Sequence, residues 1–554
     1  MNLIDRAVSY FAPNRAVRRV AARNALKVLN TGYSEGGASV RKKSMRGWRS
    51  RSASPEEDID LNLYTLRNRC RDLYMNAPLA RGSIQTTRTN VIGSGLKLKS
   101  RIDFNFLGLS EEEADEWEQT VEREFSLWAE SVHCDALKMN NFYELQQLAQ
   151  LSWLQSGDGF ALLKQDRPQP FMPYGLRVHL IEADRVCTPN TFSNVIAGEI
   201  SIFAIEGKAP NGNRVISGVE IDANGAVVAY WICNRYPQSF YFASDLSPLT
   251  WTRVEAFGPL TGRPNVLHLM ESERPEQRRG VPFLAPVIET LKQLTRYTEA
   301  ELMAAVVTGM FTVFVKTEGP TSEMPLGSMV PESMGQENPQ AETNESVDYK
   351  LGNGAINILQ PGEDVEMANP GRPNTAFEGF VDALSKYIGA ALEIPQELLQ
   401  KSFKASYSAA RAALLEAWKM FKMRRAWMAQ DFCQPIYEEW LAQAVSLGRI
   451  KAPRFFDDPV IRKAWCGAEW NGPAAGQLDP TKEAEAAQMR VENGFSTREQ
   501  ETMEINGGNF DRNVQQAKRE NAQMKEAGFN GPAISPSKRQ QANNGASDKP
   551  DENT

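Results

Sequence analysis

Only a few short patterns in this sequence contain the residue types that nucleophilic or metal-assisted catalysis requires. Gly32-Tyr-Ser34-Glu-Gly36 matches the G-x-S-x-G pattern of serine hydrolases, but that pattern needs a buried strand before it and a helix after it, and here it lies in a basic, polar segment. Paired acids that could hold a metal ion occur at Asp58-Ile-Asp60 and at Asp457-Asp458. The first pair lies at a predicted helix start, where acids favour the helix dipole. The second precedes Pro459 in a predicted loop, so we expect structural roles for both.

The histidine, cysteine and glycine patterns are also too incomplete to form a metal site or a nucleotide-binding site. His133-Cys134 has no further ligands at metal spacing, and no H-E-x-x-H is present. The six cysteines include no C-x-x-C, which argues against a disulfide scaffold or a zinc site and favours a reducing cytoplasm. There is no P-loop, and Gly93-Ser-Gly95 and Gly157-Asp-Gly159 lack the third glycine of a dinucleotide loop, so both predict turns. We therefore predict a protein that is not an enzyme and needs no cofactor.

Length and composition describe an ordinary globular chain. It has 554 residues, of which 42% are hydrophobic and 24% charged. At roughly 150 residues per domain, that length corresponds to about three or four structural units. The apolar stretch from Leu302 to Val315 has 14 residues, whereas a membrane-spanning helix needs about 20. The N-terminus lacks the apolar core of a secretory signal. We predict no membrane association.

The charge is distributed unevenly. Residues 1–52 contain twelve Lys and Arg and two acids, although the whole chain has a net charge of −7. Residues 316–372 contain ten acids and three basic residues. A basic arm on an acidic body predicts that the arm contacts a polyanion while the body does not grip one tightly. A solvated arm that only aids solubility is the alternative, and charge alone leaves both open.

Hydrophobic periodicity predicts an α+β fold in the first half of the chain. Residues 3–30 could form a basic amphipathic helix, and 31–56 are typical of a linker. Helices are predicted from Asp60 to Asn76, up to Asn90, after the capping box of Ser110 and Glu113, and over 142–155. Short strands are predicted in five runs, at 160–165, 176–182, 216–222, 226–232 and 266–270. Helices followed by strands indicate an α+β class.

The second half is predicted to be mainly helical, with one acidic interruption. Helices are expected over 284–310, 375–393 and 407–447, and shorter ones within 449–531. Between the first two, strand-like runs at 311–316 and 355–360 bracket a polar stretch. The last 23 residues contain one large aliphatic and no aromatic side chain, and we expect 532–554 to be disordered.

Four ordered segments together resemble the portal proteins of tailed bacteriophages, specifically the lambda-like portal family. The first segment is Leu66-Arg-x-Arg69-x-Arg71-Asp-Leu73 with Asn76-x-Pro78-x-Ala80 and Asn90-Val-Ile-Gly93-x-Gly95, and the second is Phe125-x-x-Trp128-Ala with Cys134-Asp135 and Phe142-x-x-Leu145-Gln146-x-Leu148-Ala149. The third segment is Val266-Leu-His268-Leu with Arg274-Pro-x-Gln277-x-Arg279-Gly280-Val-Pro282-x-Leu284-Ala-Pro286-Val287. The fourth is Ile394-Pro395 with Ser406-Tyr407-Ser408-x-Ala410-Arg411-Ala412-Ala413-Leu414. The matches extend from about 60 to 450 and exclude the arm and the tail. The third segment is the most specific.

The resemblance implies a ring-forming protein, typically of twelve subunits, with a portal fold. The ring would occupy one capsid vertex, and double-stranded DNA would enter and leave through its channel, driven by a separate terminase. The implied parts are a basic arm (1–59), an α+β wing (60–283), stem helices (284–310 and 374–393), a clip (311–373), a tunnel loop (394–407), a long helix (408–448), a crown-side region (449–531) and a disordered tail (532–554).

The resemblance also points to charged residues for each part. DNA-facing candidates near the tunnel loop are Gln400, Lys401, Lys404, Tyr407 and Arg411, although surface or inter-subunit pairing is favoured for Arg411. Stem residues Glu289, Lys292, Arg296 and Glu299 have three- and four-residue spacing, so they could form rungs between subunits or pair within the helix. Docking candidates in the clip are Glu318, Glu323, Glu332, Glu363, Asp364 and Glu366. Arm candidates are Arg15, Arg18, Arg19, Arg41, Lys42 and Lys43.

The implied partners are further copies of the chain, double-stranded DNA, the terminase large subunit, a head-completion or adaptor protein, and the major capsid and scaffold or protease proteins. The implied location is the portal vertex of the virion, after assembly in the host cytoplasm. Two alternatives remain at this stage. One is a structural head protein that binds DNA through its basic arm, and the other is a catalytic terminase component, which the absent P-loop and metal cluster disfavour.

Overall fold

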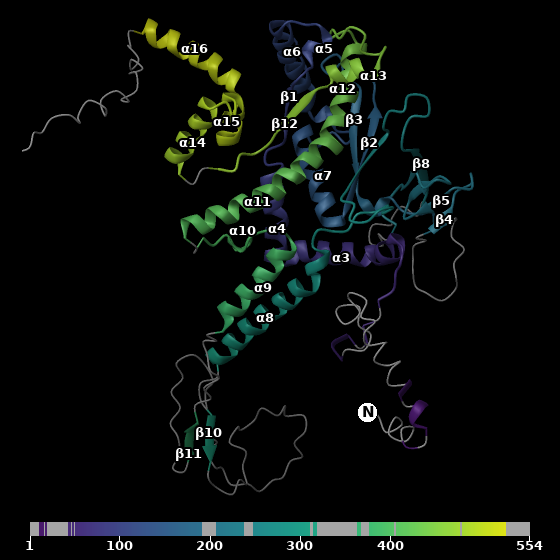
Figure 1. The fold of residues 1–554 in the computed structure, drawn as a ribbon, viewed down its shortest axis with the longest axis vertical. Helices are drawn as coiled ribbons and strands as arrows, with labels where there is room; N and C mark the ends of the chain where they lie inside the picture. The colour runs from purple at the N-terminus through teal and green to yellow at the C-terminus, as the bar shows by residue number, and fades with distance from the viewer. Residues whose placement is uncertain are drawn as a thin grey trace, which may run out of the picture. The chain divides into compact units, whose positions relative to one another are not determined.

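The computed structural model describes residues 10, 12–15, 17–18, 43–45, 47–48, 50–190, 206–237, 248–310, 314–317, 363–366, 376–403, 406–476 and 479–527 (Figure 1). Contacts divide the chain into Met1–Asp58 and Ile59–Thr554. In the first unit, residues 13–15 and 17–18 are helical and Lys43–Met45 form a short 3-10 helix. The predicted helix over 3–30 otherwise lies outside the described residues, as do Gly32–Gly36 and the tail.

The first part of the second unit is mainly helical. They are α3 (Leu61–Asn76), α4 (Pro78–Val91), α5 (Phe104–Leu107), α6 (Glu111–Ala129) and α7 (Phe142–Ser156). The predicted capping box is confirmed, because the Ser110 side chain accepts from the Glu113 amide and Glu113 accepts from the Ser110 amide. A second capping box of Asn141 and Glu144 opens α7. A π-helical turn, Glu56–Asp60, leads into α3, so Asp58 and Asp60 lie at a helix start as expected.

Two antiparallel sheets follow these helices. The first has the order β3-β2-β9, formed by Leu176–Ile181, Asp158–Gln165 and Val266–Met270. The second has the order β4-β5-β6-β7-β8, formed by Glu206–Lys208, Arg214–Ile216, Val219–Ile221, Val227–Cys233 and Trp251–Glu255. The five predicted strand runs are confirmed, with one of them divided into β5 and β6. The short strands β4 and β8 were not predicted.

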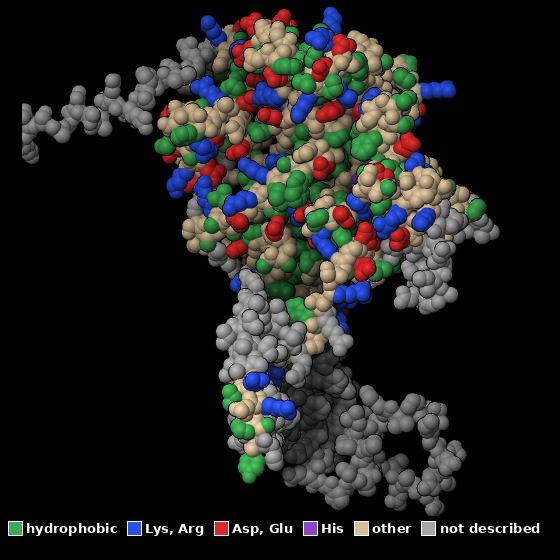
Figure 2. Space-filling model, turned by 45° about the vertical axis from the view of Figure 1, so that its right-hand side comes forward, with side chains coloured by type: hydrophobic (Ala, Val, Ile, Leu, Met, Phe, Trp, Pro, Cys, Tyr) green, Lys and Arg blue, Asp and Glu red, His purple; other side chains and the backbone are tan. Residues whose placement is uncertain are grey.

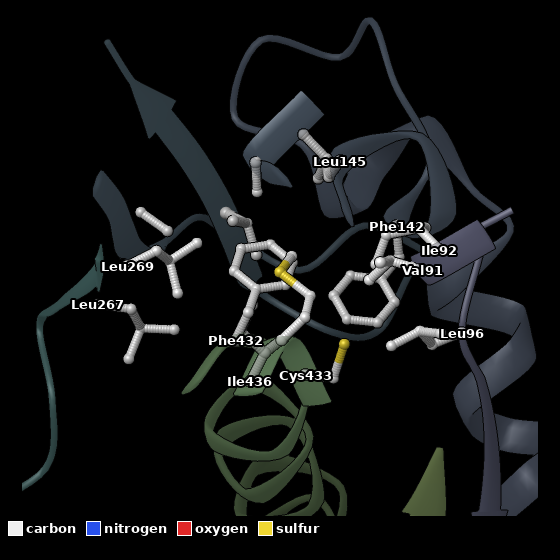
Figure 3. Close-up of a cluster of buried hydrophobic side chains, with 14 of the residues drawn as sticks. Val91, Ile92, Leu96, Phe142, Leu145, Leu267, Leu269, Phe432, Cys433 and Ile436 are labelled. Carbon is white, nitrogen blue, oxygen red and sulfur yellow. The ribbon is translucent and has the colours of Figure 1, made fainter. Parts of the chain in front are cut away.

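The β3-β2-β9 sheet separates two hydrophobic cores. Phe160 and Leu162 of β2 pack with residues of the five-stranded sheet, such as Tyr230 and Ile232. Ala161, on the opposite face of the same strand, belongs to the larger helical core, because successive strand residues point to opposite faces. Figure 3 shows part of that larger core, to which β9, α4, α7 and the segment after α11 all contribute; the labelled residues are Val91, Ile92, Leu96, Phe142, Leu145, Leu267, Leu269, Phe432, Cys433 and Ile436.

Two helices run side by side after the second sheet (Figure 1). A 3-10 turn, Ala285–Val287, leads into α8 (Ile288–Met310), and α9 (Phe377–Ala391) returns. Tyr297 of α8 lies against Phe377 and Phe380 of α9, with ring centroids 5.7 and 4.8 Å apart. Between the two helices, β10 (Phe314–Thr317) pairs antiparallel with β11 (Glu363–Glu366). The strand predicted at 355–360 lies outside the described residues.

The segment predicted as a loop over 394–407 contains a short helix, α10 (Gln396–Gln400). It begins after Pro395, which suits a first helical turn because proline lacks an amide hydrogen. The long helix that follows consists of α11 (Tyr407–Met428), a π-helical segment (Ala429–Cys433) and α12 (Gln434–Ser446). The π-helical segment places both Phe432 and Cys433 in the core.

The remaining elements are α13 (Pro459–Trp465), β12 (Ala468–Asn471), α14 (Pro480–Glu492), α15 (Arg498–Asn506) and α16 (Phe510–Glu526). Strand β12 pairs antiparallel with β1 (Lys97–Ser100), a pairing that was not predicted. Asp458 caps α13, because its carboxylate accepts from the Val460 amide, which agrees with the structural role expected for Asp457-Asp458.

Candidate functional site

A buried carboxylate, Asp158, connects the sheet region to the start of α8. It lies at the start of β2 and its side chain has no solvent exposure. Arg67 of α3 donates to its Oδ1 at 2.9 Å, and Nε of Arg279 donates to its Oδ2 at 2.5 Å. Nε2 of His268 lies 3.5 Å from the same Oδ2. The first and third segments of the family resemblance therefore meet at this one carboxylate.

Arg279 fixes the chain immediately before α8. Its guanidinium donates to three backbone carbonyls, those of Ala183, Val186 and Ser217. The next residue, Gly280, lies against Gly157, where an added Cβ at 280 would come within 1.9 Å of the carbonyl oxygen of 157. No larger residue fits there without moving the backbone. Gly157 ends α7 with a positive φ of 87°, whereas Asp158 and Gly159 already belong to β2, so the turn predicted for 157–159 is limited to its first residue and the strand begins with a buried charge.

The electrostatics of this cluster favour the charged state of Asp158. Burial alone would raise the pKa of Asp158, but Arg279 and Arg67 outweigh it and hold that pKa well below its usual range. Burial also lowers the pKa of Arg67 to about 10. At neutral pH, one anion is therefore enclosed by two cations. Because none of the three side chains is exposed by more than 6%, the cluster cannot meet a substrate, and its role is to position α8.

A second layer of charge surrounds this centre. Arg71 pairs with Asp184, and with Glu182 at 2.9 Å between Nη2 and Oε1. Sequence reasoning assigned no role to Asp158. The available signal was an acid between two glycines directly before an apolar strand, a place where burial is expected and an unpaired charge would be costly.

The outward face of α8 carries the four stem residues. Glu289, Lys292, Arg296 and Glu299 are all exposed, and none of them forms an ion pair within the part of the chain that the structure describes. The predicted alternative of pairing within the helix is not observed among these residues. The same spacing continues into Met303 and Val306, which are 61% and 43% exposed. One face of α8 is thus charged near the body and apolar farther along.

Helix α9 leaves a complementary apolar face uncovered. Phe380 and Tyr387, seven residues apart, are 46% and 66% exposed, and Ala383 and Ala390 between and beyond them are exposed too. Ile388, on the opposite side of α9, is fully buried. Apart from a charged stripe of Glu378, Asp382 and Lys386, α9 is apolar on more than its buried side, a pattern typical of a second contact surface.

The tunnel-loop candidates have different environments. Gln400 is part-buried and donates to Asp382 at 3.1 Å. Lys401 is exposed and caps α10 in the left-handed conformation, with φ of 54°. Arg411 forms an ion pair with Glu483 of α14 at 3.7 Å, which supports the pairing role that the sequence favoured, although within one subunit. Tyr407 is the first residue of α11. Lys404 lies outside the described residues.

The clip and arm candidates are described only in part. Glu363, Asp364 and Glu366 lie on β11, whose register pairs Glu366 with Phe314. Glu318, Glu323 and Glu332 lie outside the described residues. In the arm, Arg15, Arg18 and Lys43 are exposed. Arg19, Arg41 and Lys42 fall outside the described residues.

The described surface shows no field of a single charge sign on the face in Figure 2, where Lys and Arg alternate with Asp and Glu. Among the described residues, no group of three His, Cys, Asp or Glu side chains could hold a metal ion. No helix in the described part of the chain is long and apolar enough to cross a membrane.

Comparison with known proteins assigns the family. The model for phage portal proteins of the lambda family matches residues 41–425. The chain belongs to the lambda family of phage portal proteins.

Individual relatives agree over nearly the whole chain. The portal protein of Escherichia phage N15 is 24% identical, and the match covers 91% of this chain and 92% of that protein. Portal protein B of Escherichia phage lambda is 25% identical, with 91% of each chain covered. Among solved structures, a chain from the virion of a native gene transfer agent particle is 13% identical, with a TM-score of 0.41, and the match covers 80% of this chain and 93% of that chain.

Proposed function

We propose that copies of this chain form a closed ring, with twelve as the expected number, at one vertex of a phage capsid. Double-stranded DNA would enter through the axial channel during packaging and leave through it during ejection. Membership of a family of structural portal proteins supports this proposal, and we expect no catalytic activity. The family match extends far beyond the basic arm, so a protein acting through that arm alone is not favoured.

The exposed faces of α8 and α9 carry the ring proposal. Both faces are exposed in the described chain, although Phe380 also contacts Tyr297, and the two faces differ, as a head-to-tail interface requires. Met303 and Val306 of one copy would pack on Phe380 and Tyr387 of the next. Burying such side chains contributes about 25 cal/mol per Å² of apolar surface, before the cost of association. The charged half of α8 would set the register.

A channel for DNA should not bind it tightly. Each neutralised phosphate adds salt-dependent affinity, so a dense cationic lining would oppose sliding. The face in Figure 2 mixes positive and negative side chains, which agrees with a channel that binds DNA only weakly. Lys401, exposed and without an ion pair among the described residues, is our candidate for a transient phosphate contact. Gln400 and Arg411 already bond within the subunit and are weaker candidates.

The partners follow from the family and the charge distribution. We propose that the acidic segment containing β10 and β11 docks the terminase large subunit during packaging and a head-completion or adaptor protein afterwards. Residues 316–372 contain ten acids, which would suit a basic partner surface. The basic arm would meet the major capsid protein, scaffold or protease, or DNA. The ring would assemble in the host cytoplasm and remain in the virion.

Negative-stain imaging of the purified full chain tests the main proposal. Rings with an axial hole and near twelve-fold symmetry support it. Monomers under all ionic conditions, or particles without a hole, would overturn it. An accompanying ATP-turnover assay should give no activity above buffer, and turnover would indicate a motor component instead.

A further inference from the structure

The C-terminal module, residues 479–527, consists of the three helices α14, α15 and α16. Arg490 of α14 and Glu501 of α15 form a bidentate ion pair with N–O distances of 2.7 and 2.6 Å. Asp479, Thr497 and Asn509 cap the three helices in turn. The module therefore has a defined internal structure.

The module contributes almost nothing to the hydrophobic cores. Of its described apolar residues, only Ala487 is buried, and it belongs to none of the core clusters. Helix α16 has no buried residue at all. A cleft of about 1010 Å³ remains between Trp418 and Trp470 of the body and Met503 of the module. Since tightly packed interiors leave few voids of that size, apolar packing is not what holds the module in place.

Ion pairs hold it instead. Each joins a cation of the body to a carboxylate of the module: Lys99 to Asp511 at 2.9 Å and to Glu499 at 3.8 Å, Arg101 to Glu499, Lys422 to Glu504 at 3.2 Å, and Arg411 to Glu483 at 3.7 Å. Except for Lys99, these side chains are partly exposed. Exposed pairs are worth about 0–1 kcal/mol each and weaken in salt.

The link to the body permits movement. Pro473 is fixed, because its carbonyl accepts from Arg425 at 2.8 Å and its ring lies against Gly93. Ala474, Ala475 and Gly476 follow, and Gly476 has a positive φ of 77°. Small residues and glycine allow the chain to change direction at little cost.

We call the four body cations Lys99, Arg101, Arg411 and Lys422 the cationic strip, because each of them pairs with a carboxylate of the module. Lys99 and Arg101 are two residues apart along β1 and its end, so they point to the same side. Arg411 and Lys422 are eleven residues apart on α11, which is about three helical turns. In the closed arrangement every one of them is bound to a carboxylate of the module.

We infer that the C-terminal module is a reversible cover that masks a binding strip for the phosphate backbone of DNA. Phosphate and carboxylate oxygens accept from Arg and Lys in the same way, so a DNA backbone can replace the module's acids. Because the module's own carboxylates compete with phosphate for the cationic strip, DNA binds to the strip only where it displaces the module. The choice of DNA as the polyanion rests on the proposed function, whereas the masking rests on the ion pairs alone.

The test compares two full-length variants with equal charge changes. The unmasking variant carries Glu483→Gln, Glu499→Gln, Glu504→Gln and Asp511→Asn. It removes the carboxylates of the module that pair with the strip and leaves the body acids Glu122 and Glu469, at 3.8 and 3.9 Å from Lys99 and Arg101, in place. The control carries Glu485→Gln, Glu492→Gln, Glu520→Gln and Glu526→Gln, which are exposed acids on α14 and α16 with no ion pair to the body. Both variants gain four units of positive charge.

Amine labelling followed by mass spectrometry reports whether the module opens. Lys99 is only 6% exposed in the closed arrangement. At low salt, Lys99 should be labelled readily in the unmasking variant and protected in wild type and control. Raising the salt should expose it in wild type as well. Equal protection in all three proteins at every salt concentration would show that ion pairs do not hold the module.

Fluorescence anisotropy with a short DNA duplex measures how tightly each variant binds DNA. The unmasking variant should bind about tenfold more tightly than the control, with a steeper dependence on salt, because each added phosphate contact raises the slope of log K against log salt by about 0.9. Equal affinities despite an exposed Lys99 would overturn the DNA assignment. Ring formation by both variants in negative stain distinguishes this failure from failure of the portal proposal.

Discussion

Asp158 and Arg279 form a fully buried ion pair although they are 121 residues apart in the sequence, with Nε and Oδ2 separated by 2.5 Å. The pair joins the first strand of the β3-β2-β9 sheet to the segment that leads into α8. A helix that carries the proposed ring interface needs a fixed base. In this chain, that base is a charge cluster rather than hydrophobic packing alone.

Removing the carboxylate should destabilise the protein strongly. Asp158→Ala leaves Arg67 and Arg279 buried without their shared anion, and breaking a buried pair in this way costs about 3–5 kcal/mol. Chemical denaturation of wild type and variant measures the difference. Glu206→Gln, which breaks the exposed Arg214–Glu206 pair, serves as the control and should cost less than about 1 kcal/mol. Similar losses in both variants would contradict the role given to Asp158.

A second buried acid predicts how stability depends on pH. Glu220 of β6 is inaccessible to solvent and accepts from Arg253 at 2.8 and 3.0 Å, from Asn211, from Asn213 and from the Trp231 indole. Burial would raise the pKa of Glu220, but these donors, Arg253 first, lower it to about 2. A depressed carboxyl pKa stabilises the fold above the unfolded value of about 4.3, and this stability is lost as the pH falls towards about 2.

Glu220→Gln should therefore reduce stability most at neutral pH. The difference from wild type should shrink by at most about 3 kcal/mol between pH 7 and pH 2.5, because the unfolded wild-type chain binds a proton at Glu220 over this range while the folded chain binds it only near pH 2. Denaturation midpoints at several pH values measure it. A constant difference over this range would show that Glu220 does not carry the charge, and Glu206→Gln again provides the exposed comparison.

Local signals in the sequence were enough to predict many elements. The capping box at Ser110 and the strand at 160–165 depend on neighbouring residues, and both occur in the structure, whereas the turn predicted at 157–159 is limited to Gly157 because β2 begins at Asp158. Strand β1 was missed because its partner, β12, lies almost 370 residues away, and short polar strands give little periodicity of their own. The helix α10 inside the predicted loop escaped for a similar reason, since five residues are too few for a periodic pattern.

The contacts within the candidate site were harder to predict from the sequence than the helices and strands. The family resemblance selected the segments containing Arg67 and Arg279, but only the fold shows that both reach Asp158. Likewise, the sequence favoured a pairing role for Arg411, whereas the identity of its partner, Glu483, depends on how α14 docks. Ion pairs between distant segments leave no pattern along the chain, because any of the many exposed charged residues could in principle be the partner.

The charged face of α8 should determine how neighbouring copies associate. Lys292→Glu with Arg296→Glu replaces both cations of the stripe and places four acids along one helix face. Because the stripe would then carry only negative charge, it could no longer match the charges of the neighbouring copy, so rings should be lost or should form less readily than in wild type. Mass photometry measures the fraction of rings. Lys208→Glu with Lys463→Glu, on β4 and α13, changes the net charge equally and should leave the rings intact.

A second variant, in which the two acids of the α8 stripe are also reversed, completes that experiment. Adding Glu289→Lys and Glu299→Lys restores the net charge but inverts the charge pattern of the stripe, so rings should stay rare because the facing α9 of the neighbouring copy is unchanged. Circular dichroism checks that the double variant keeps its helices. Rings of normal abundance in the double variant would show that the stripe lies away from the interface, and the apolar faces alone would then have to account for association.

Lys401 provides the sharpest test of contact between the ring and moving DNA. Its side chain is exposed, its backbone holds the left-handed conformation at the end of α10, and Lys404 follows three residues later. Lys401→Glu with Lys404→Glu should reduce the DNA retained per particle, because two attractive phosphate contacts per subunit become repulsive. Lys208→Glu with Lys463→Glu again matches the charge change. DNA content per purified particle, measured by absorbance ratio, should fall only in the first variant. Equal DNA content in both would remove Lys401 from the channel, while rings of normal appearance in both would leave the portal assignment unaffected.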